Sequence, residues 1–395
     1  MTSIVTLQSP INSYQDYVSG YYQVGSEIFV NKTVALIRGS ETKIFPTWHF
    51  HSDVYSHMLW HHTTSLPLDD LYRQRALQLR DNYDFISLSF SGGADSYTSL
   101  MAFLDNNIFI DEIFVRWPIK ATADRHAVSR DPQAANILSE WHLTILPMLD
   151  QLQNRLHPNT KLTIVDWSAR ILQDEVVDTH WAQNQDFFNP GFRIKLDTVT
   201  DSARDAIEKG KRTALLFGVD KPQLCVRNGH VYCYFLDKLA HSHAHHPWDQ
   251  YCELFYWTKD MPEIVVAQCQ MIYQHLVNRP ALADLIQWGN PYNHTNKTLW
   301  DKIVGAIIYP GYSSKWFQAE KPSTLIFAEV DAWMYNYHDL RFMQSWKYVI
   351  KNHMTGVDTK FIEYRDNKPI GYVGFFDQMY HLGPMPVSPA HSPSN

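Results

Sequence analysis

The sequence predicts an α/β protein built around a mainly parallel β-sheet. Four short apolar runs are typical of buried strands, and segments with helical periodicity separate them. Strands that alternate with helices of this length favour a doubly wound sheet with helices on both faces. Polar clusters follow the ends of these runs. Ligands of such sheets bind at the carboxyl ends of the strands, so we expect a binding site there.

The predicted sheet and its helices occupy the centre of the chain. The strands are expected at Tyr83–Phe90, Ile110–Trp117, Lys161–Trp167 and Thr213–Val219. Helices are expected from Tyr97 to Leu104, from Pro132 to Leu156, and from Thr198 to Lys211. Apolar residues three or four positions apart predict the first two helices, and Gly210 predicts the end of the third.

Two further local signals lie beyond these strands. Asn228 and Gly229 divide an alternating segment, Cys225–Leu236, and favour a tight β-hairpin turn. A helix is expected at Pro262–Leu276. The aromatic run from Phe255 to Trp257 is interpreted as core packing rather than as a pocket wall.

We expect four regions along the chain, with α+β extensions on both sides of the core. Residues 1–80 form an N-terminal extension, with strand-like pieces in SEIFVNKTVALIRG and a helix at Leu68–Arg80. Residues 81–240 form the core, and residues 241–382 form a helical and mixed region for the substrate. Residues 383–395 are rich in proline and serine, which predicts a disordered tail.

The composition argues against several classes of protein. A net charge of −7 disfavours a protein that holds long nucleic acid through many phosphates. The four cysteines contain no Cys-x-x-Cys pair, so neither a zinc knuckle nor a redox dithiol is expected. The sequence shows no secretion signal and no stretch of 18 apolar residues. We therefore expect a cytoplasmic protein with no membrane partner; a homo-oligomer is compatible with this sequence.

The segment SGGADS, from Ser91 to Ser96, is the strongest candidate for a binding site. Gly92 and Gly93 allow a sharp turn and a close approach of the backbone to a ligand. The turn precedes a predicted helix, whose N-terminus favours an anion. Asp95 repels phosphate, so its place here makes sense if it holds Mg²⁺ or orients a loop amide. The alternative is an ordinary capped turn, with Ser and Asp side chains bonded to helix amides.

The segment LSFSGGADS resembles the Ser-Gly-Gly-x-Asp-Ser signature of the PP-loop superfamily, the N-type ATP pyrophosphatases. The resemblance covers about residues 81–240 and implies a HUP-like sheet. It implies that Ser91, Gly92, Gly93, Asp95 and Ser96 bind the β,γ-phosphates of ATP. Ala94 stands where many sulfur-related members have lysine, and other members carry Leu or Val there. The chain also resembles uncharacterised bacteriophage-encoded members through FSGGADS, FGVDKP and ELFYWTKDMPEIV, which places it in a host cytoplasm.

The loop itself contains no cation, so the family chemistry needs one from elsewhere. Lys221, in FGVDKP after the fourth strand, is the best candidate, and its neighbour Asp220 is expected to share Mg²⁺ with Asp95. Both are also explained by a solvated Asp-Lys-Pro turn. Arg116 is a candidate for ribose or phosphate binding, although a plain surface arginine is the somewhat better explanation. Asp166 and Arg193 are equally open.

The resemblance implies an ATP-dependent enzyme that adenylates an acceptor and releases pyrophosphate. Position 2 is Thr, so the first 80 residues are not the cysteine-dependent glutaminase domain of asparagine-type synthetases. We expect a small or nucleotide-like acceptor. One alternative is an enzyme similar to phosphoadenylylsulfate reductases, although Cys269, the last cysteine, lies far from the C-terminus. Another alternative is a nucleotide-binding module without turnover.

A histidine-rich segment invites a metal hypothesis. His241, His243 and His245 alternate and are followed by His246, but no carboxylate or cysteine lies at a familiar spacing. A polar loop is the preferred interpretation.

Overall fold

The computed structural model describes residues 18–30, 32–62, 66–117, 140–166, 199–237, 248–288, 294–311, 362–365, 368–372 and 375–385. Several sequence-based candidates lie outside these ranges. They are Pro132 at the start of a predicted helix, Trp167, Arg193 and the segment His241–His246.

The largest sheet among the described residues is five-stranded and all-parallel. Its strands are β4 (Phe85–Ser89), β5 (Glu112–Trp117), β6 (Lys161–Asp166), β7 (Thr213–Phe217) and β10 (Cys252–Leu254), in the order β10-β7-β4-β5-β6. The four predicted strands are all present. The short edge strand β10 was not predicted, and it lies beyond the predicted core of residues 81–240.

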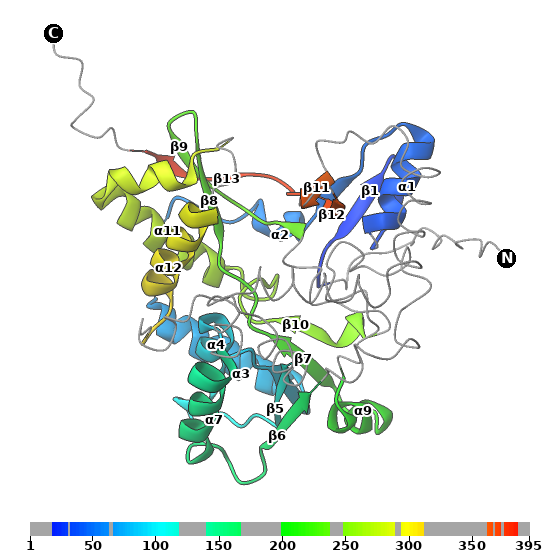
Figure 1. Cartoon of the computed structure of the whole chain (residues 1–395), viewed down its shortest axis with the longest axis vertical. Coiled ribbons are helices and arrows are strands. Elements are labelled where there is room, and N and C mark those ends of the chain that lie inside the picture. The colour runs from blue at the N-terminus through cyan, green and yellow to red at the C-terminus, as the bar shows by residue number, and fades with distance from the viewer. Residues whose placement is uncertain are drawn as a thin grey trace.

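Helices cover the sheet on both sides, as Figure 1 shows. They are α3 (Leu68–Asn82), α4 (Ala94–Leu104) and α7 (Leu146–Gln153) on one side and α9 (Asp201–Glu208) on the other. A π-helical turn, Glu140–Ile145, precedes α7. This arrangement confirms the predicted α/β class and is compatible with a doubly wound fold.

The strand order fixes where a ligand would bind. From β4, the chain places β5 and β6 on one side and then returns to place β7 and β10 on the other. The direction of winding therefore reverses between β4 and β7. In open α/β sheets, the crevice outside the carboxyl ends of the strands at this reversal is the usual ligand site.

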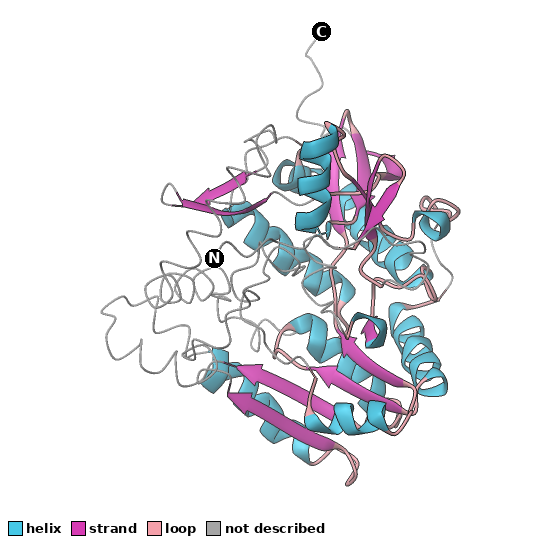
Figure 2. Ribbon diagram, turned by 90° about the vertical axis from the view of Figure 1, so that its right-hand side faces the viewer, coloured by secondary structure: helices cyan, strands magenta, loops and turns pink. Residues whose placement is uncertain are grey.

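Smaller antiparallel sheets lie on one side of the parallel sheet, and Figure 2 shows the parallel strands apart from them. One contains β2 (Glu27–Phe29), β1 (Tyr21–Val24) and β3 (Thr47–His49), and another contains β13 (Tyr380–Pro384), β9 (His230–Tyr234) and β8 (Gln223–Arg227). A third is the pair β11 (Ile362–Arg365) and β12 (Lys368–Tyr372). The remaining helices are α1 (Lys32–Thr42), α2 (Ser52–Tyr55), α11 (Glu263–Asn278), α12 (His294–Ile308) and the 3₁₀ segments Asp249–Tyr251 and Pro280–Ile286.

The hairpin β8–β9 confirms the turn predicted from Asn228 and Gly229. Both residues have positive φ, 51° and 74°, which is the conformation that the tight two-residue turn requires. The predicted helices at residues 68–80 and 262–276 are also present, as α3 and α11.

Two expectations about the ends of the chain need correction. The strand-like segment SEIFVNKTVALIRG contains only one strand, β2, because its second half forms the helix α1. Val34 and Ala35 are buried there, so tertiary packing outweighs the β-propensity of the branched residues. Residues 383 and 384 belong to β13, and the N–H of Met385 donates to the carbonyl of Gly229 at 2.8 Å. Residues 386–395 lie outside the described chain.

Within the described residues, no helix has the length and apolarity needed to cross a membrane.

Candidate functional site

The segment Ser91–Ser96 connects the carboxyl end of β4 to the first turn of α4. The N–H of Phe90 donates to the carbonyl of Phe114 at 2.7 Å, which keeps the chain in the sheet up to the turn. Gly92 has a φ of 72°, which glycine adopts without strain. A Cβ on Gly92 would lie 2.6 Å from Cγ1 of Ile145, so only glycine fits beneath the turn preceding α7.

The serines of the loop bond mainly to the loop itself. The N–H of Ser91 donates to Oγ of Ser96 at 3.2 Å, and that hydroxyl donates to the carbonyl of Gly93 at 3.1 Å. Oγ of Ser91 accepts a long bond, 3.4 Å, from the N–H of Gly93. Ser91 is exposed, while Gly92, Gly93 and Ser96 are buried. The loop is thus a compact turn that its own hydroxyl groups hold in place.

The N-terminus of α4 differs from that of α9. Gly93 is the N-cap of α4 and provides no side-chain cap. In α9, by contrast, Oγ1 of the N-cap Thr200 accepts from the N–H of Ala203 at 3.1 Å. A helix N-terminus without a side-chain cap favours an anion, because the first amides of a helix have no intrahelical partner. The helices α3, α7 and α11 also have no side-chain cap, so the missing cap leaves the first amides of α4 open to an anion but does not by itself distinguish α4 from them.

The end of β7 packs directly on the first turn of α4. A Cβ on Gly218 would lie 2.9 Å from the carbonyl oxygen of Asp95 and from N and Cα of Ser96. Only glycine allows this approach, which brings Asp220 and Lys221 to the loop. The two segments that meet here follow β4 and β7, the strands on either side of the reversal.

Lys221 lies between two carboxylates. Its Nζ is 2.9 Å from Oδ2 of Asp95 and 3.9 Å from Oδ1 of Asp220. The three side chains are only 19–21% exposed. Oδ1 of Asp220 also accepts from the N–H of Lys221 at 2.5 Å. The structure therefore brings together the three residues predicted to be catalytic.

The charges of this group alter its acid–base behaviour. Burial raises the pKa of Asp220 to about 6; Lys221 opposes the rise and Asp95 adds to it. Burial alone would lower the pKa of Lys221, but the carboxylates of Asp95, Asp220 and Asp301 outweigh burial and raise that pKa above its ordinary value. Lys221 therefore stays charged near neutral pH, as a phosphate-binding cation must.

Two tyrosines from distant segments complete the site, and no local sequence pattern indicates either role. The hydroxyl of Tyr309, just after α12, donates to Oδ1 of Asp95. The hydroxyl of Tyr256 donates to the backbone carbonyl of Asp95 at 2.8 Å. Phe255, Tyr256 and Trp257 are fully buried, which confirms the packing interpretation of that run. Tyr256 combines this packing role with a contact to the site.

The remaining predicted residues lie at neighbouring strand ends. Arg116 is near the end of β5 and Asp166 ends β6. The contacts that join the loop to Lys221 and Tyr309 involve neither residue.

The donor set suits magnesium better than a softer metal. No group of three His, Cys, Asp or Glu side chains that could hold a metal occurs in the described parts of the chain. Asp95 and Asp220 instead offer two carboxylates on either side of Lys221. Mg²⁺ in nucleotide sites typically uses one or two carboxylates and completes its shell with waters and substrate phosphates. Asp95 and Asp220 fit that pattern.

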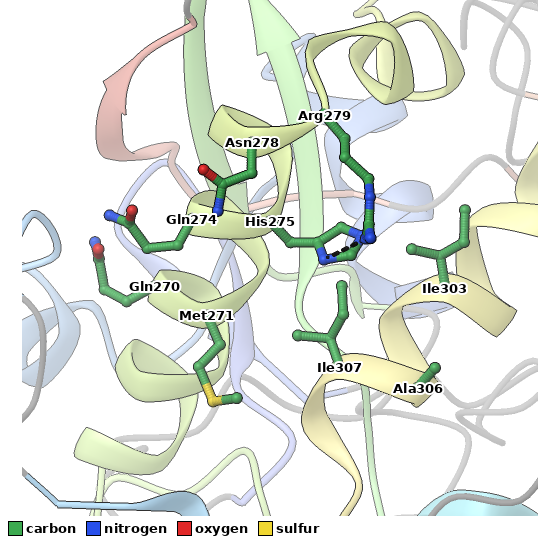
Figure 3. Close-up of a pocket in the computed structure, with 9 residues that line it drawn as sticks. All are labelled: Gln270, Met271, Gln274, His275, Asn278, Arg279, Ile303, Ala306 and Ile307. Carbon is green, nitrogen blue, oxygen red and sulfur yellow. Dashed lines mark hydrogen bonds between the residues drawn. The ribbon is translucent and has the colours of Figure 1, made fainter.

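A separate pocket of about 700 Å³ lies between α11 and α12, as Figure 3 shows. Its apolar wall includes Ile303 and Ile307, and its polar rim includes His275 and Arg279. The guanidinium of Arg279 is 2.7 Å from Nε2 of His275. None of the loop residues lines this pocket, so it is not the predicted phosphate site.

No model of a protein family matches the chain, and neither the curated proteins nor the solved structures contain a significant match.

Proposed function

We propose that this chain binds ATP with its β,γ-phosphates against residues Ser91–Ser96 and transfers the AMP moiety to an acceptor. The observation that carries this proposal is the meeting of three elements at one point. The uncapped N-terminus of α4, the partly buried Lys221 and two carboxylates lie together at the reversal of the sheet. A cation beside helix amides suits a polyphosphate, and the carboxylates suit its divalent counterion.

Each group has a separate part in the proposed reaction. The first amides of α4 and Lys221 neutralise the charge that builds up on the departing diphosphate. An acceptor oxygen bonds to the α-phosphorus, and the bond from that phosphorus to the bridging oxygen breaks. Pyrophosphate leaves with the electron pair, and a nucleophile such as an amine then displaces AMP from the acceptor. Mg²⁺, held by Asp95 and Asp220, would neutralise phosphate charge when bound.

The cysteines do not favour the alternative of a thiol-dependent reductase. All four are buried. Burial raises the pKa of Cys225 to about 12 and the pKa of Cys269 well above its ordinary value. Thiols in this environment stay protonated, whereas reductive chemistry needs an accessible thiolate.

Release of pyrophosphate tests the proposed function. The purified protein is incubated with MgATP, ammonium as the nucleophile, and pools of carboxylate, amide and nucleotide-like acceptors, and AMP and pyrophosphate are followed by ³¹P NMR. We expect equal amounts of the two products in the presence of one pool, and loss of both with Asp95→Ala. Binding of MgATP without AMP formation in any pool would instead indicate a nucleotide-binding module.

A further inference from the structure

The C-terminal part of the described chain contributes directly to the proposed nucleotide site. Tyr309 follows α12, and its N–H donates to the carbonyl of Gly305 at 3.1 Å, so it continues the last turn of that helix. Its side chain is 3% exposed, and its hydroxyl donates to Oδ1 of Asp95. The other oxygen of the same carboxylate accepts from Lys221.

The contact of Tyr309 with Asp95 is well placed to fix one orientation of that carboxylate. A carboxylate whose two oxygens are held by different donors has little freedom to rotate. Nζ of Lys221 also lies 5.9 Å from the centre of the Tyr309 ring, within the range of a cation–π contact. Burial raises the pKa of Tyr309 well above its ordinary value, so its hydroxyl remains a donor at physiological pH.

The end of α12 also contacts the helix α3. The helix α3 holds the end of α12 through a contact that does not involve Asp95. The hydroxyl of Tyr72 in α3 donates to the carbonyl of Ile308 at 2.8 Å. The end of α12 is therefore anchored next to the site by one tyrosine and joined to it by another.

We propose that Tyr309 is a positioning residue through which α12 controls the nucleotide site: its hydroxyl holds Asp95 in the orientation that pairs with Lys221. This inference rests on the proposed function, because it assumes that Asp95 and Lys221 act on ATP. A carboxylate and ammonium already in place bind a magnesium–phosphate group without the cost of ordering them. The position of α12 then decides whether this preorganised pair exists.

Calorimetric titration of the full chain with MgATP tests the inference. Tyr309→Phe removes only the hydroxyl, and we expect it to weaken MgATP binding about 10-fold, the usual effect of losing one hydrogen bond to a charged group. Tyr72→Phe is the control, since it removes a buried hydroxyl that donates to the same end of α12 and accepts from Gln268 of α11, but it leaves the hydrogen bond from Tyr309 to Asp95 in place. Tyr72→Phe should leave the affinity for MgATP unchanged. In the absence of ligand, it should lower the thermal midpoint at least as much as Tyr309→Phe does.

The possible outcomes separate the two proposals. Wild-type protein that gives no heat with MgATP would overturn the proposed function and this inference with it. Normal wild-type binding with an unchanged or tighter affinity in Tyr309→Phe would overturn the inference alone. Equal losses of affinity in Tyr309→Phe and Tyr72→Phe would overturn it as well, because the effect would then come from general packing of α12.

A second measurement keeps the test specific to Asp95. In an Asp95→Ala background, the probe is pyrophosphate without magnesium, because removal of the carboxylate also removes its repulsion of the anion. Adding Tyr309→Phe to this background should then change the pyrophosphate affinity less than 2-fold. If Tyr309 acts only through Asp95, removing its hydroxyl has no further effect once the carboxylate of Asp95 is gone. A larger change would show that Tyr309 acts by another route than Asp95 and would contradict the proposal.

Discussion

At the scale of single residues, Lys221 and two aspartates decide the character of the site. A lysine that is only 19% exposed needs a carboxylate partner, and Lys221 has Asp95 at 2.9 Å and Asp220 at 3.9 Å. This arrangement leaves one excess negative charge among the three groups. A divalent cation would offset that charge when a nucleotide arrives, which is why we assign the carboxylates to magnesium and the lysine to phosphate.

Replacement of Lys221 tests its role as the phosphate-binding cation. We expect Lys221→Ala to weaken MgATP binding by about 1.5–3 kcal/mol, roughly 10- to 100-fold, because a charge-assisted contact to phosphate is lost. Calorimetry measures the affinity. Lys209→Ala serves as the control, since Lys209 pairs with Asp205 at the exposed end of α9. Equal affinities of the wild type and Lys221→Ala would refute the role.

The ionisation of Asp220 predicts a pH-dependent stability. Its pKa in the folded chain is about 6, above its ordinary value of 3.8, so the folded state holds the extra proton between about pH 4 and pH 6. The free energy of unfolding must then fall as pH rises through this interval. Asp220→Asn, which cannot ionise, should be more stable than the wild type by about 1–3 kcal/mol at pH 8.

Thermal midpoints of the wild type and of Asp220→Asn, measured between pH 4 and pH 8, check this prediction. The advantage of Asp220→Asn should decline as pH is lowered through 6 and vanish near pH 4. An advantage that is the same at every pH would have to come from something other than ionisation of Asp220.

At the scale of elements, the sequence predicted what depends on local patterns. The strands β4 to β7, the hairpin at Asn228 and Gly229, and the helices α3 and α11 follow from periodicity and turn residues. The helix α1 was mistaken for a strand because Thr33, Val34 and Ile37 are β-branched. Its buried face is set by packing against β1 and β2, which a local pattern does not show.

The contact between β7 and α4 makes the strongest prediction at this scale. A Cβ at position 218 must displace the backbone of Asp95 and Ser96, which lie 2.9 Å away. Gly218→Ala should lower the free energy of unfolding by about 1–3 kcal/mol, as overpacking does, and should weaken MgATP binding. Denaturant unfolding and calorimetry measure the two effects.

Gly210→Ala is the control for Gly218→Ala. Gly210 has a φ of 72° and open space around its Cα, so alanine there costs about 1 kcal/mol of stability through backbone strain alone. Its MgATP affinity should stay at the wild-type value. A Gly218→Ala variant that binds like Gly210→Ala would show that the close approach does not shape the site.

At the scale of the whole molecule, the site depends on segments far apart in the chain. Asp95 meets Lys221 across 126 positions, the hydroxyl of Tyr256 across 161 and that of Tyr309 across 214. Lys221 could be predicted because it follows a recognisable strand. Tyr309 and Gly218 could not, since their roles arise only when α12 and β7 are packed against α4.

The parallel sheet also depends on segments outside the predicted core, so we predict that residues 81–240 do not fold alone. The fifth strand, β10, and nearly all of the helix α3 lie outside that range. Arg75 of α3 is fully buried and donates to Oε2 of Glu253 at 2.7 Å and to the carbonyl of Leu254 at 2.9 Å, which ties α3 to β10. A fragment of residues 81–240 should show no cooperative thermal transition by circular dichroism, whereas the full chain should. Cooperative unfolding of the fragment would show that the sheet is independent of both elements.

The most direct test of the central claim is a crystal structure of the full chain with a non-hydrolysable ATP analogue and Mg²⁺. We expect the β- and γ-phosphates to contact the amides between Gly92 and Ser96, with Lys221 beside them and the metal bound to the carboxylates of Asp95 and Asp220. An analogue bound elsewhere, such as the pocket between α11 and α12, with the loop unchanged, would contradict the account.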